Sequence, residues 1–261
     1  MKSASSRRGP KTPDGLDQVY GVHALQSLLD RGEAPRELWV QQGAGNRLKE
    51  VVAQAQAHGA RVKEQPRDLL DQLTQGAAHQ GVVAFCPPLT PEGEESLWLK
   101  LRAWPSSTPP LLLILDGVTD VHNFGACLRS ADAAGAHGVI VAKDKAAPLN
   151  ATVRKVACGA AEVVPVYQVT NLARTLAKLK DAGVWITGTA GEAEASVFDI
   201  DMTGPTALVM GAEGKGMRRL TREACDNLAK LPMAGEVSSL NVSVATGICL
   251  FEAVRQRQLA S

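Results

Sequence analysis

The chain has 261 residues, of which 45% are hydrophobic and 4% aromatic, and its formal net charge is +1. This length is enough for one large domain or two smaller ones with packed cores. The near-neutral charge does not indicate a nucleic-acid binder, and so few aromatic residues leave little surface on which single-stranded bases could stack.

Cysteine and histidine patterns exclude two further classes. The five cysteines are scattered and form no CxxC pair, which favours reduced thiols over a disulfide framework or a zinc site. The five histidines show no ligand spacing, so we expect no metal. No apolar run is long enough to span a bilayer and no N-terminal stretch resembles a signal peptide. We therefore expect a cytoplasmic protein with no membrane partner.

The first part of the chain predicts a basic tail followed by a small α/β domain. The first eleven of residues 1–15 include four basic residues, Lys2, Arg7, Arg8 and Lys11, and no acid, which is typical of a disordered tail; a weak contact with RNA is the alternative. Residues 16–87 then alternate between two periodicities. The expected elements are a helix at 22–30, a strand at 37–41, a helix at 47–59, a strand at 61–65, a helix at 67–73 and a strand at 81–86.

Residues 88–110 interrupt this pattern with clusters of proline. Prolines at both ends indicate a linker, and LWLKLRAW between them predicts a short helix. We place the domain boundary there.

Residues 111–261 predict a second α/β domain. Continuous apolar strands are expected at 111–116, 138–142, 162–166, 184–189, 207–211 and 228–232. Helices are expected around 125–135, within 149–161, at 171–183, at 217–227 and at the C-terminus. This alternation favours a parallel sheet covered on both faces. Such sheets bind ligands beyond the carboxyl ends of their strands, so the loops there are the candidate site.

The loop after strand 111–116 leads into NFGACLR. If Asn123 caps the following helix, Arg129 lies near its second turn. A helix N-terminus together with a guanidinium suits a phosphate. A plain cap and a surface arginine remain an equally open interpretation.

Two further loops are rich in small residues. The small residues of GTAGEAEASVFD would let a ligand approach the backbone, although this window by itself favours a simple loop. GAEGKGMRRL matches neither the GxxxxGK[ST] nor the GxGxxG pattern, so both nucleotide fingerprints fail. It predicts a tight turn that presents Glu213 at a strand end, or merely a glycine turn with a solvated carboxylate.

The last loop, GEVSSLNVSVATGICLFEA, places Ser238, Ser239, Asn241 and Ser243 at the start of an apolar helix. One capping residue would satisfy a helix start, so the surplus suggests that something polar is held there. The helix itself is apolar on much of its girth. We interpret it as a dimer surface, with a core helix as the alternative.

Together, NFGACLR, ALVMGAEGKGM and LPMAGEVSSLNVSVATGICLFEA resemble the three motifs of the SpoU (TrmH-like) branch of the SPOUT RNA methyltransferases, over residues 111 to 257. VYGVHAL and HQGVVAF resemble the edges of the small L7Ae-like RNA-binding domain that precedes the catalytic domain in some members. The resemblance implies methylation of the ribose 2′-hydroxyl of a guanosine in the peptidyl-transferase P loop of 23S ribosomal RNA, on free RNA or a pre-ribosomal particle.

The resemblance also implies a deep trefoil knot in the C-terminal sheet, a homodimer and S-adenosylmethionine as methyl donor. The implied catalytic residues are Asn123, Arg129, Glu213, Ser239 and Asn241. The implied donor-binding residues are Thr189, Gly191, Gly211, Leu231, Met233 and Leu240.

A guanidinium is always protonated, so we expect Arg129 to clamp a phosphate while a phosphate oxygen, Glu213 or water takes the proton. Basic side chains in the same domain are candidates for contacts to the RNA backbone, with a solvated surface as the alternative. They are Arg154, Lys155, Lys215, Arg218 and Arg219. Rival functions are the same chemistry on transfer RNA or another ribosomal site, and a non-catalytic RNA-binding protein of this fold.

Overall fold

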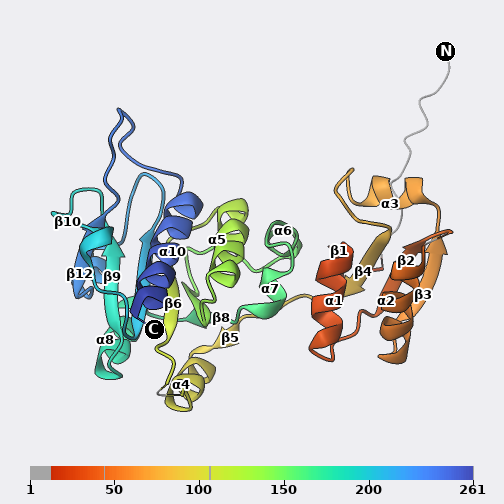
Figure 1. The fold of residues 1–261 in the computed structure, drawn as a ribbon, viewed down its shortest axis with the longest axis horizontal. Coiled ribbons are helices and arrows are strands. Elements are labelled where there is room, and N and C mark those ends of the chain that lie inside the picture. The colour runs from red at the N-terminus through yellow and green to blue at the C-terminus, as the bar shows by residue number, and fades with distance from the viewer. Residues whose placement is uncertain (1–12, 44, 106, 261) are drawn as a thin grey trace. The chain divides into compact units, whose positions relative to one another are not determined.

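The computed structural model describes residues 13–43, 45–105 and 107–260, which form two compact units divided between Leu89 and Thr90. Most of the predicted basic tail, residues 1–15, lies outside the described residues. Each unit is a separate α/β body with its own core (Figure 1).

The first unit contains a four-stranded sheet in the described part of the chain, with the order β1-β4-β2-β3. Strands β1 (Asp17–Tyr20) and β2 (Glu37–Gln41) run antiparallel to β4 (Val82–Cys86), and β3 (Arg61–Gln65) runs parallel to β2. Three helices accompany them, namely α1 (Val22–Asp30), α2 (Asn46–Ala57) and α3 (Arg67–Leu73). The helices and strands predicted in this region are confirmed, and β1 is an additional strand.

Side-chain alternation along β2 divides the core of this unit in two. Leu38 and Val40 pack in the cluster that contains α1 and α2, whereas Trp39 between them packs with Leu70 of α3 and with Phe85. Successive residues of a strand point to opposite faces, so one strand serves both layers. The Trp39 and Phe85 rings meet edge to face with centroids 4.9 Å apart.

The second unit is built on an eight-stranded sheet, counted over the described residues, in which every pair of neighbours is parallel. The spatial order is β10-β12-β9-β11-β6-β7-β8-β5. The strands are β5 (Glu92–Gly93), β6 (Leu111–Asp116), β7 (Gly138–Ala142), β8 (Val166–Val169), β9 (Trp185–Thr189), β10 (Ala195–Ser196), β11 (Thr206–Gly211) and β12 (Asn227–Lys230). The predicted parallel sheet is therefore present.

Helices cover both faces of this sheet. The core of one face joins residues of α4 (Glu94–Arg102) and α8 (Leu172–Asp181) to β6, β7, β9 and β11. α5 (Val121–Ala133) and α10 (Val242–Ala260) pack side by side, and they contact β7 and β11 respectively (Figure 1). The remaining helices are α6 (Ala151–Val156), α7 (Ala160–Val163), α9 (Arg219–Glu223) and the 3₁₀ turn Val197–Asp199.

Residues 88–110 differ from the predicted linker. Residues 90–110 belong to the second unit, where β5 pairs with β8 and α4 packs against the same strand. Leu97 of α4 is 1% exposed. The prolines there lie at the ends of helices and strands. Burial of the apolar face of LWLKLRAW in the core stabilises this segment and offsets the entropy lost when it becomes ordered.

Other boundaries differ from the predicted ones for local reasons. Asn123 is not the cap of α5; Asp120 is, and its carboxylate accepts a hydrogen bond from the Asn123 N–H at 2.8 Å. The strand expected at 162–166 begins only at Val166, because Pro165 has no N–H to donate to a ladder. The helix expected at 217–227 is confined to α9.

The C-terminal helix is buried on one side only. Val242, Thr246, Cys249, Leu250 and Ala253 are buried. Val244 and Phe251 are 51% and 49% exposed in this single chain. Helix α10 is therefore both a core helix and the carrier of an exposed apolar face.

None of the described helices is both long and apolar enough to cross a membrane. Among the same residues, no cluster of three His, Cys, Asp or Glu side chains is placed to hold a metal ion.

Candidate functional site

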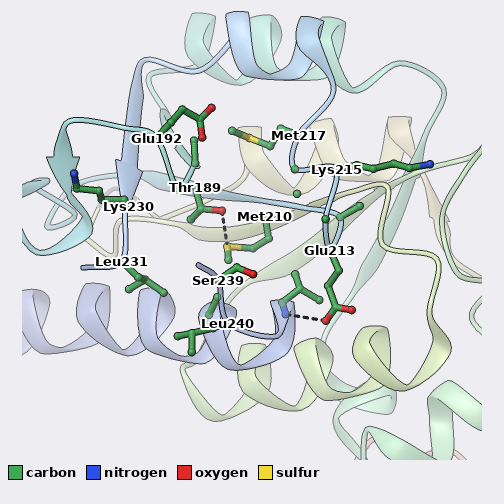
Figure 2. A pocket seen from close by; sticks show the side chains of 18 of the residues that line it. Thr189, Glu192, Met210, Glu213, Lys215, Met217, Lys230, Leu231, Ser239 and Leu240 are labelled. Atoms are coloured by element: carbon green, nitrogen blue, oxygen red, sulfur yellow. Dashed lines mark hydrogen bonds between the residues drawn. The ribbon is translucent and has the colours of Figure 1, made fainter. Parts of the chain in front are cut away.

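A pocket of about 450 Å³ lies beyond the carboxyl ends of β9, β11 and β12, against the start of α10 (Figure 2). Its walls come from the segments 189–192, 210–217 and 229–233 and from the residues that lead into α10. Three of the four loops that the sequence selected therefore meet in one cavity. In open parallel sheets this edge, where the strand order changes direction, is the usual ligand position. We call this cavity the donor pocket, because the residues predicted to bind the methyl donor line it.

All six predicted donor-binding residues line the donor pocket, which are Thr189, Gly191, Gly211, Leu231, Met233 and Leu240. Leu231 and Leu240 form one apolar side, and Met210 and Met217 contribute thioethers (Figure 2). The Thr189 hydroxyl donates to the Val209 carbonyl at 3.2 Å. The pocket thus combines apolar surface with exposed strand-end backbone, which suits a nucleoside-sized ligand of mixed polarity.

Gly211 allows the loop after β11 to fold back on its own strand. A Cβ at Gly211 would lie 2.3 Å from the Gly216 carbonyl carbon and 2.4 Å from the Met217 nitrogen. Ala212 and Gly216 exchange two backbone hydrogen bonds of 3.1 and 2.8 Å, which close the turn. The predicted tight turn is present, and Glu213 projects from it.

Glu213 is the centre of a polar cluster that joins three elements. Its Oε1 accepts hydrogen bonds from Asn123 Nδ2 at 3.2 Å, from Asn241 Nδ2 at 2.6 Å and from the Val242 backbone N–H at 3.3 Å. Asn241 Nδ2 also donates to Asn123 Oδ1 at 2.9 Å. Three predicted catalytic residues from positions up to 118 residues apart therefore meet. We call them the Glu213 cluster.

The hydrogen-bond pattern fixes how the amides of this cluster point. Asn241 Oδ1 accepts from the Ser243 N–H at 2.9 Å and from its hydroxyl at 2.6 Å, so the NH₂ of Asn241 must face Glu213. Within the described part of the chain, Glu213 Oε2 has no hydrogen-bond partner, and Asn123 Nδ2 has only one acceptor. One acceptor and one donor thus remain open to a ligand hydroxyl.

The other two predicted catalytic residues lie apart from this cluster. Ser239 lines the donor pocket (Figure 2). Arg129 is exposed on α5, and its Nη1 lies 3.7 Å from Cys158 Sγ, a weak contact. The structure therefore brings three of the five residues together and leaves Arg129 on a neighbouring surface.

The predicted RNA-contacting residues fall into different environments. Arg154 is 4% exposed and forms a buried ion pair with Glu162, so it cannot reach RNA. Arg218 donates from its backbone N–H and its Nε to the buried Asp116 carboxylate, at 2.7 and 2.5 Å.

The remaining three candidates for RNA contact are Arg219, Lys215 and Lys155. Arg219 pairs with Glu223 at 2.7 Å. Lys215 has no acidic partner among the described residues. Lys155 is exposed on α6.

The thiols of buried Cys127 and half-buried Cys225 do not supply a nucleophile. Burial raises the pKa of Cys127, behind Asn123 on α5, to about 11, although a hydrogen bond with Thr246 opposes the shift. Burial also raises the pKa of Cys225 to about 11. Both remain protonated at neutral pH, and a thiol is a far weaker nucleophile than a thiolate.

Some contributors to the site carry no sequence signal. The Val242 donor is a backbone group, so no residue type could have indicated it. Glu192, in the loop after β9, and Arg222, in helix α9, form an ion pair at the pocket wall. Met210 and Met217 are apolar residues with no motif signal of their own, and the fold shows that they border the cavity.

Family comparisons match both units. The model described as "SpoU rRNA Methylase family" matches residues 110–251, and the one described as "RNA 2'-O ribose methyltransferase substrate binding" matches residues 18–92. The chain is 57% identical over 246 residues to the 23S rRNA (guanosine-2'-O-)-methyltransferase RlmB of Pseudomonas putida, covering 94% of this chain and 98% of the relative. It is 55% identical over 243 residues to the protein of that name from Escherichia coli K12, with coverages of 92% and 99%.

Solved structures of methyltransferases are also similar to this chain. The SpoU methyltransferase AviRb from Streptomyces viridochromogenes in complex with AdoMet aligns with a TM-score of 0.76 and 28% identity, over 94% of this chain and 92% of that one. An AdoMet-bound rRNA methyltransferase from Sinorhizobium meliloti aligns with a TM-score of 0.74 and 28% identity, over 92% and 87%.

Proposed function

This chain belongs to the SpoU rRNA methylase family, and on that premise we propose that it methylates the ribose 2′-hydroxyl of a guanosine in the peptidyl-transferase P loop of 23S ribosomal RNA. It is an RNA 2′-O-ribose methyltransferase that uses S-adenosylmethionine. The observation that carries the proposed site is the Glu213 cluster, which borders the donor pocket and keeps an acceptor and a donor open.

The donor pocket fits S-adenosylmethionine in size and lining. Leu231, Leu240 and the two methionines offer apolar surface to an adenine ring, and the strand-end backbone at Thr189 and Gly211 offers donors and acceptors to its polar edges. When bound, S-adenosylmethionine supplies a methyl group made electrophilic by its sulfonium. The chain's own contribution is to hold the accepting hydroxyl in line and to exclude competing water.

We assign the proton of the 2′-hydroxyl to Glu213. Oε1 is already held by three N–H groups, whereas Oε2 is open and can accept a hydrogen bond from the hydroxyl. Asn123 keeps an N–H with which it can orient the same oxygen, and Asn241 locks both partners. Carboxylates at hydrogen-bond distance are ordinary general bases, and this assignment selects one of the three acceptors that the sequence left open.

Arg129 fills a different role in this proposal. Its guanidinium stays protonated and cannot act as a base, and it lies outside the Glu213 cluster. A bidentate fork suits a phosphodiester next to the accepting ribose. Arg129 therefore clamps the RNA backbone and leaves the proton to Glu213.

The proposal includes the architecture around the site. β11 lies between β6 and β9, although two other strands separate β6 from β9 in the sequence; this order supports the trefoil knot. Residues 16–87 act as an L7Ae-like RNA-binding domain, in accord with the substrate-binding family match. We place the enzyme in the cytoplasm, where ribosomal RNA is modified.

We also propose a homodimer formed through the exposed face of α10. Val244 and Phe251 supply apolar surface there. Sedimentation should show a dimer for the natural chain and a monomer for Phe251→Glu, whose half-exposed position leaves the fold intact. A monomeric natural chain would contradict the proposal.

The test of function is methyl transfer from labelled S-adenosylmethionine to unmodified 23S ribosomal RNA, with transfer RNA in parallel, followed by mapping of the modified ribose. We expect a single 2′-O-methylguanosine in the peptidyl-transferase P loop. Label only in transfer RNA would keep the chemistry and refute the target. Donor binding without transfer to RNA or to a pre-ribosomal particle would refute the catalytic role.

A further inference from the structure

A second pocket, of about 490 Å³, adjoins the donor pocket across the turn 212–216. Its other walls come from the loop 116–120 after β6, from Asn123 and from Lys145 in the loop after β7. The two pockets share Glu213 and Val242, the turn residues Ala212 and Gly216, and Lys215. A ligand in each pocket would therefore meet its neighbour at the Glu213 cluster.

Backbone and side-chain bonds hold the walls of this second pocket in place. The Ala147 N–H donates to the Val118 carbonyl at 2.9 Å, which ties the loop after β7 to the loop after β6. Asp116, which is 1% exposed, accepts two hydrogen bonds from Arg218, which also lines this pocket. The cavity is thus formed before any ligand binds, which reduces the ordering cost of binding.

Two lysines that line this pocket form no ion pair with a carboxylate of the described residues. The Arg218 charge is balanced by Asp116, and Asp120 is engaged as the cap of α5. Lys145 and Lys215 have no acidic partner among residues 13–43, 45–105 and 107–260. Lys215 extends away from the Leu231 and Leu240 side of the donor pocket (Figure 2). Lys145 is held at φ 60°, a backbone conformation that few non-glycine residues adopt.

We propose that this second pocket binds the accepting nucleotide of the RNA, with Lys145 contacting the phosphodiester next to the methylated ribose. The inference rests on the proposed function, and it assigns the place of the RNA substrate within it. A 2′-hydroxyl is always one carbon away from a 3′-phosphodiester, so a ribose bound at Glu213 brings a phosphate into the same cavity. Unpaired lysines are the groups that attract it, and the donor pocket on the other side of the turn stays available for the methyl donor.

The test compares Lys145→Ala with Lys143→Ala in the full chain. Lys143 is an exposed lysine in the same loop that does not line the pocket, so it is a matched control. We expect Lys145→Ala to weaken binding of a 23S ribosomal RNA fragment about five-fold at moderate salt, and Lys145→Glu to weaken it further. The slope of log affinity against log salt should fall in magnitude by about 0.7 for Lys145→Ala, because one contact to a single-stranded phosphate is lost.

Further measurements distinguish a failure of the pocket assignment from a failure of the proposed function. S-adenosylmethionine binding, measured by calorimetry, should be the same in Lys145→Ala and Lys143→Ala, and Lys145→Arg should bind RNA as tightly as the natural chain. Equal RNA affinity and equal salt slopes in Lys145→Ala and Lys143→Ala would overturn the pocket assignment, even if the natural chain methylates RNA normally. If Lys145→Ala weakens RNA binding as expected but the natural chain transfers no methyl group, the result would support the pocket assignment and refute the proposed function.

Discussion

The two units each contain a glutamate that accepts several hydrogen bonds, and the two differ in what they leave open. In the first unit, Glu37 Oε1 accepts from Trp39 Nε1 at 2.5 Å and from Lys63 at 2.8 Å, and Glu37 is only 6% exposed. In the second unit, Glu213 is exposed, accepts three bonds at one oxygen and keeps the other oxygen unpaired within the described residues.

We interpret this difference as one between a carboxylate that stabilises the fold and a carboxylate that we propose takes part in the reaction. The partners of Glu37 are on its own strand and the next one, so the cluster is complete within one sheet. The partners of Glu213 come from the start of two helices and meet only at the rim of a cavity. Removing Glu37 should therefore change stability, whereas removing Glu213 should change the reaction.

The largest expected effect is that of Glu213→Gln on the rate of methyl transfer. The amide keeps the shape of the side chain but cannot take a proton, so kcat should fall by at least about 100-fold. The affinity for S-adenosylmethionine should change less than about three-fold, and the melting temperature should stay the same. Glu236→Gln, an exposed glutamate in the loop before α10, is the control. A Glu213→Gln enzyme with near-normal kcat would leave a phosphate oxygen or water as the base.

A second comparison within the second unit uses two glycines. A Cβ at Gly211 would collide with the backbone of Gly216 and Met217, whereas a Cβ at Gly204 would meet nothing within 4 Å. Gly211→Ala must displace the turn that carries Glu213, and we expect a loss of about 2 kcal/mol in the free energy of unfolding together with a marked loss of donor affinity. Gly204→Ala should be neutral in both urea unfolding and calorimetry. Equal behaviour of the two variants would show that the turn can move without cost.

Much of the second unit could be predicted from the sequence because its strands are continuous apolar runs. LLLILD and GVIVA match β6 and β7 in full. The segment 88–110 could not be assigned in this way, because proline clusters mark a linker and an element boundary equally well. Only the burial of Leu97 against the sheet distinguishes the two. The short pair β5–β8 likewise depends on contacts between distant segments.

For the candidate site, the sequence indicated which loops meet but not how their side chains connect. Asn123, Glu213 and Asn241 were each predicted from motifs, and the parallel sheet explains why they lie at one edge. The cap position of α5 was wrong, since Asp and Asn three residues apart are both good caps and only backbone geometry selects Asp120. Arg154 was a wrong candidate for RNA contact, because it forms a buried ion pair with Glu162, eight residues away. No sequence pattern indicates that pair.

The smallest expected effect is that of Glu37→Gln on the stability of the first unit. Burial tends to raise the pKa of the Glu37 carboxyl, but hydrogen bonds from Lys63 and Trp39 outweigh it and hold the pKa below its ordinary value of about 4.5. A carboxylate whose pKa is lower in the folded state stabilises that state above the unfolded pKa, and this contribution is lost as the pH falls through the folded pKa. At pH 7, Glu37→Gln should therefore lower the free energy of unfolding by about 1 kcal/mol.

The stability difference between Glu37→Gln and the natural chain should depend on pH, because it arises from the charge on Glu37. The difference from the natural chain should begin to shrink as the pH falls below about 4.5, where the unfolded carboxyl takes up a proton, and should vanish as the pH falls through the lower pKa of folded Glu37. Hydrogen exchange of the amides in β2, compared with those in β6 as an internal reference, measures the effect in the full chain. Glu64→Gln, exposed on β3, is the matched control and should leave both strands unchanged. A loss in Glu37→Gln that stayed constant from pH 7 to pH 3 would show that packing, and not the charge on Glu37, stabilises this sheet.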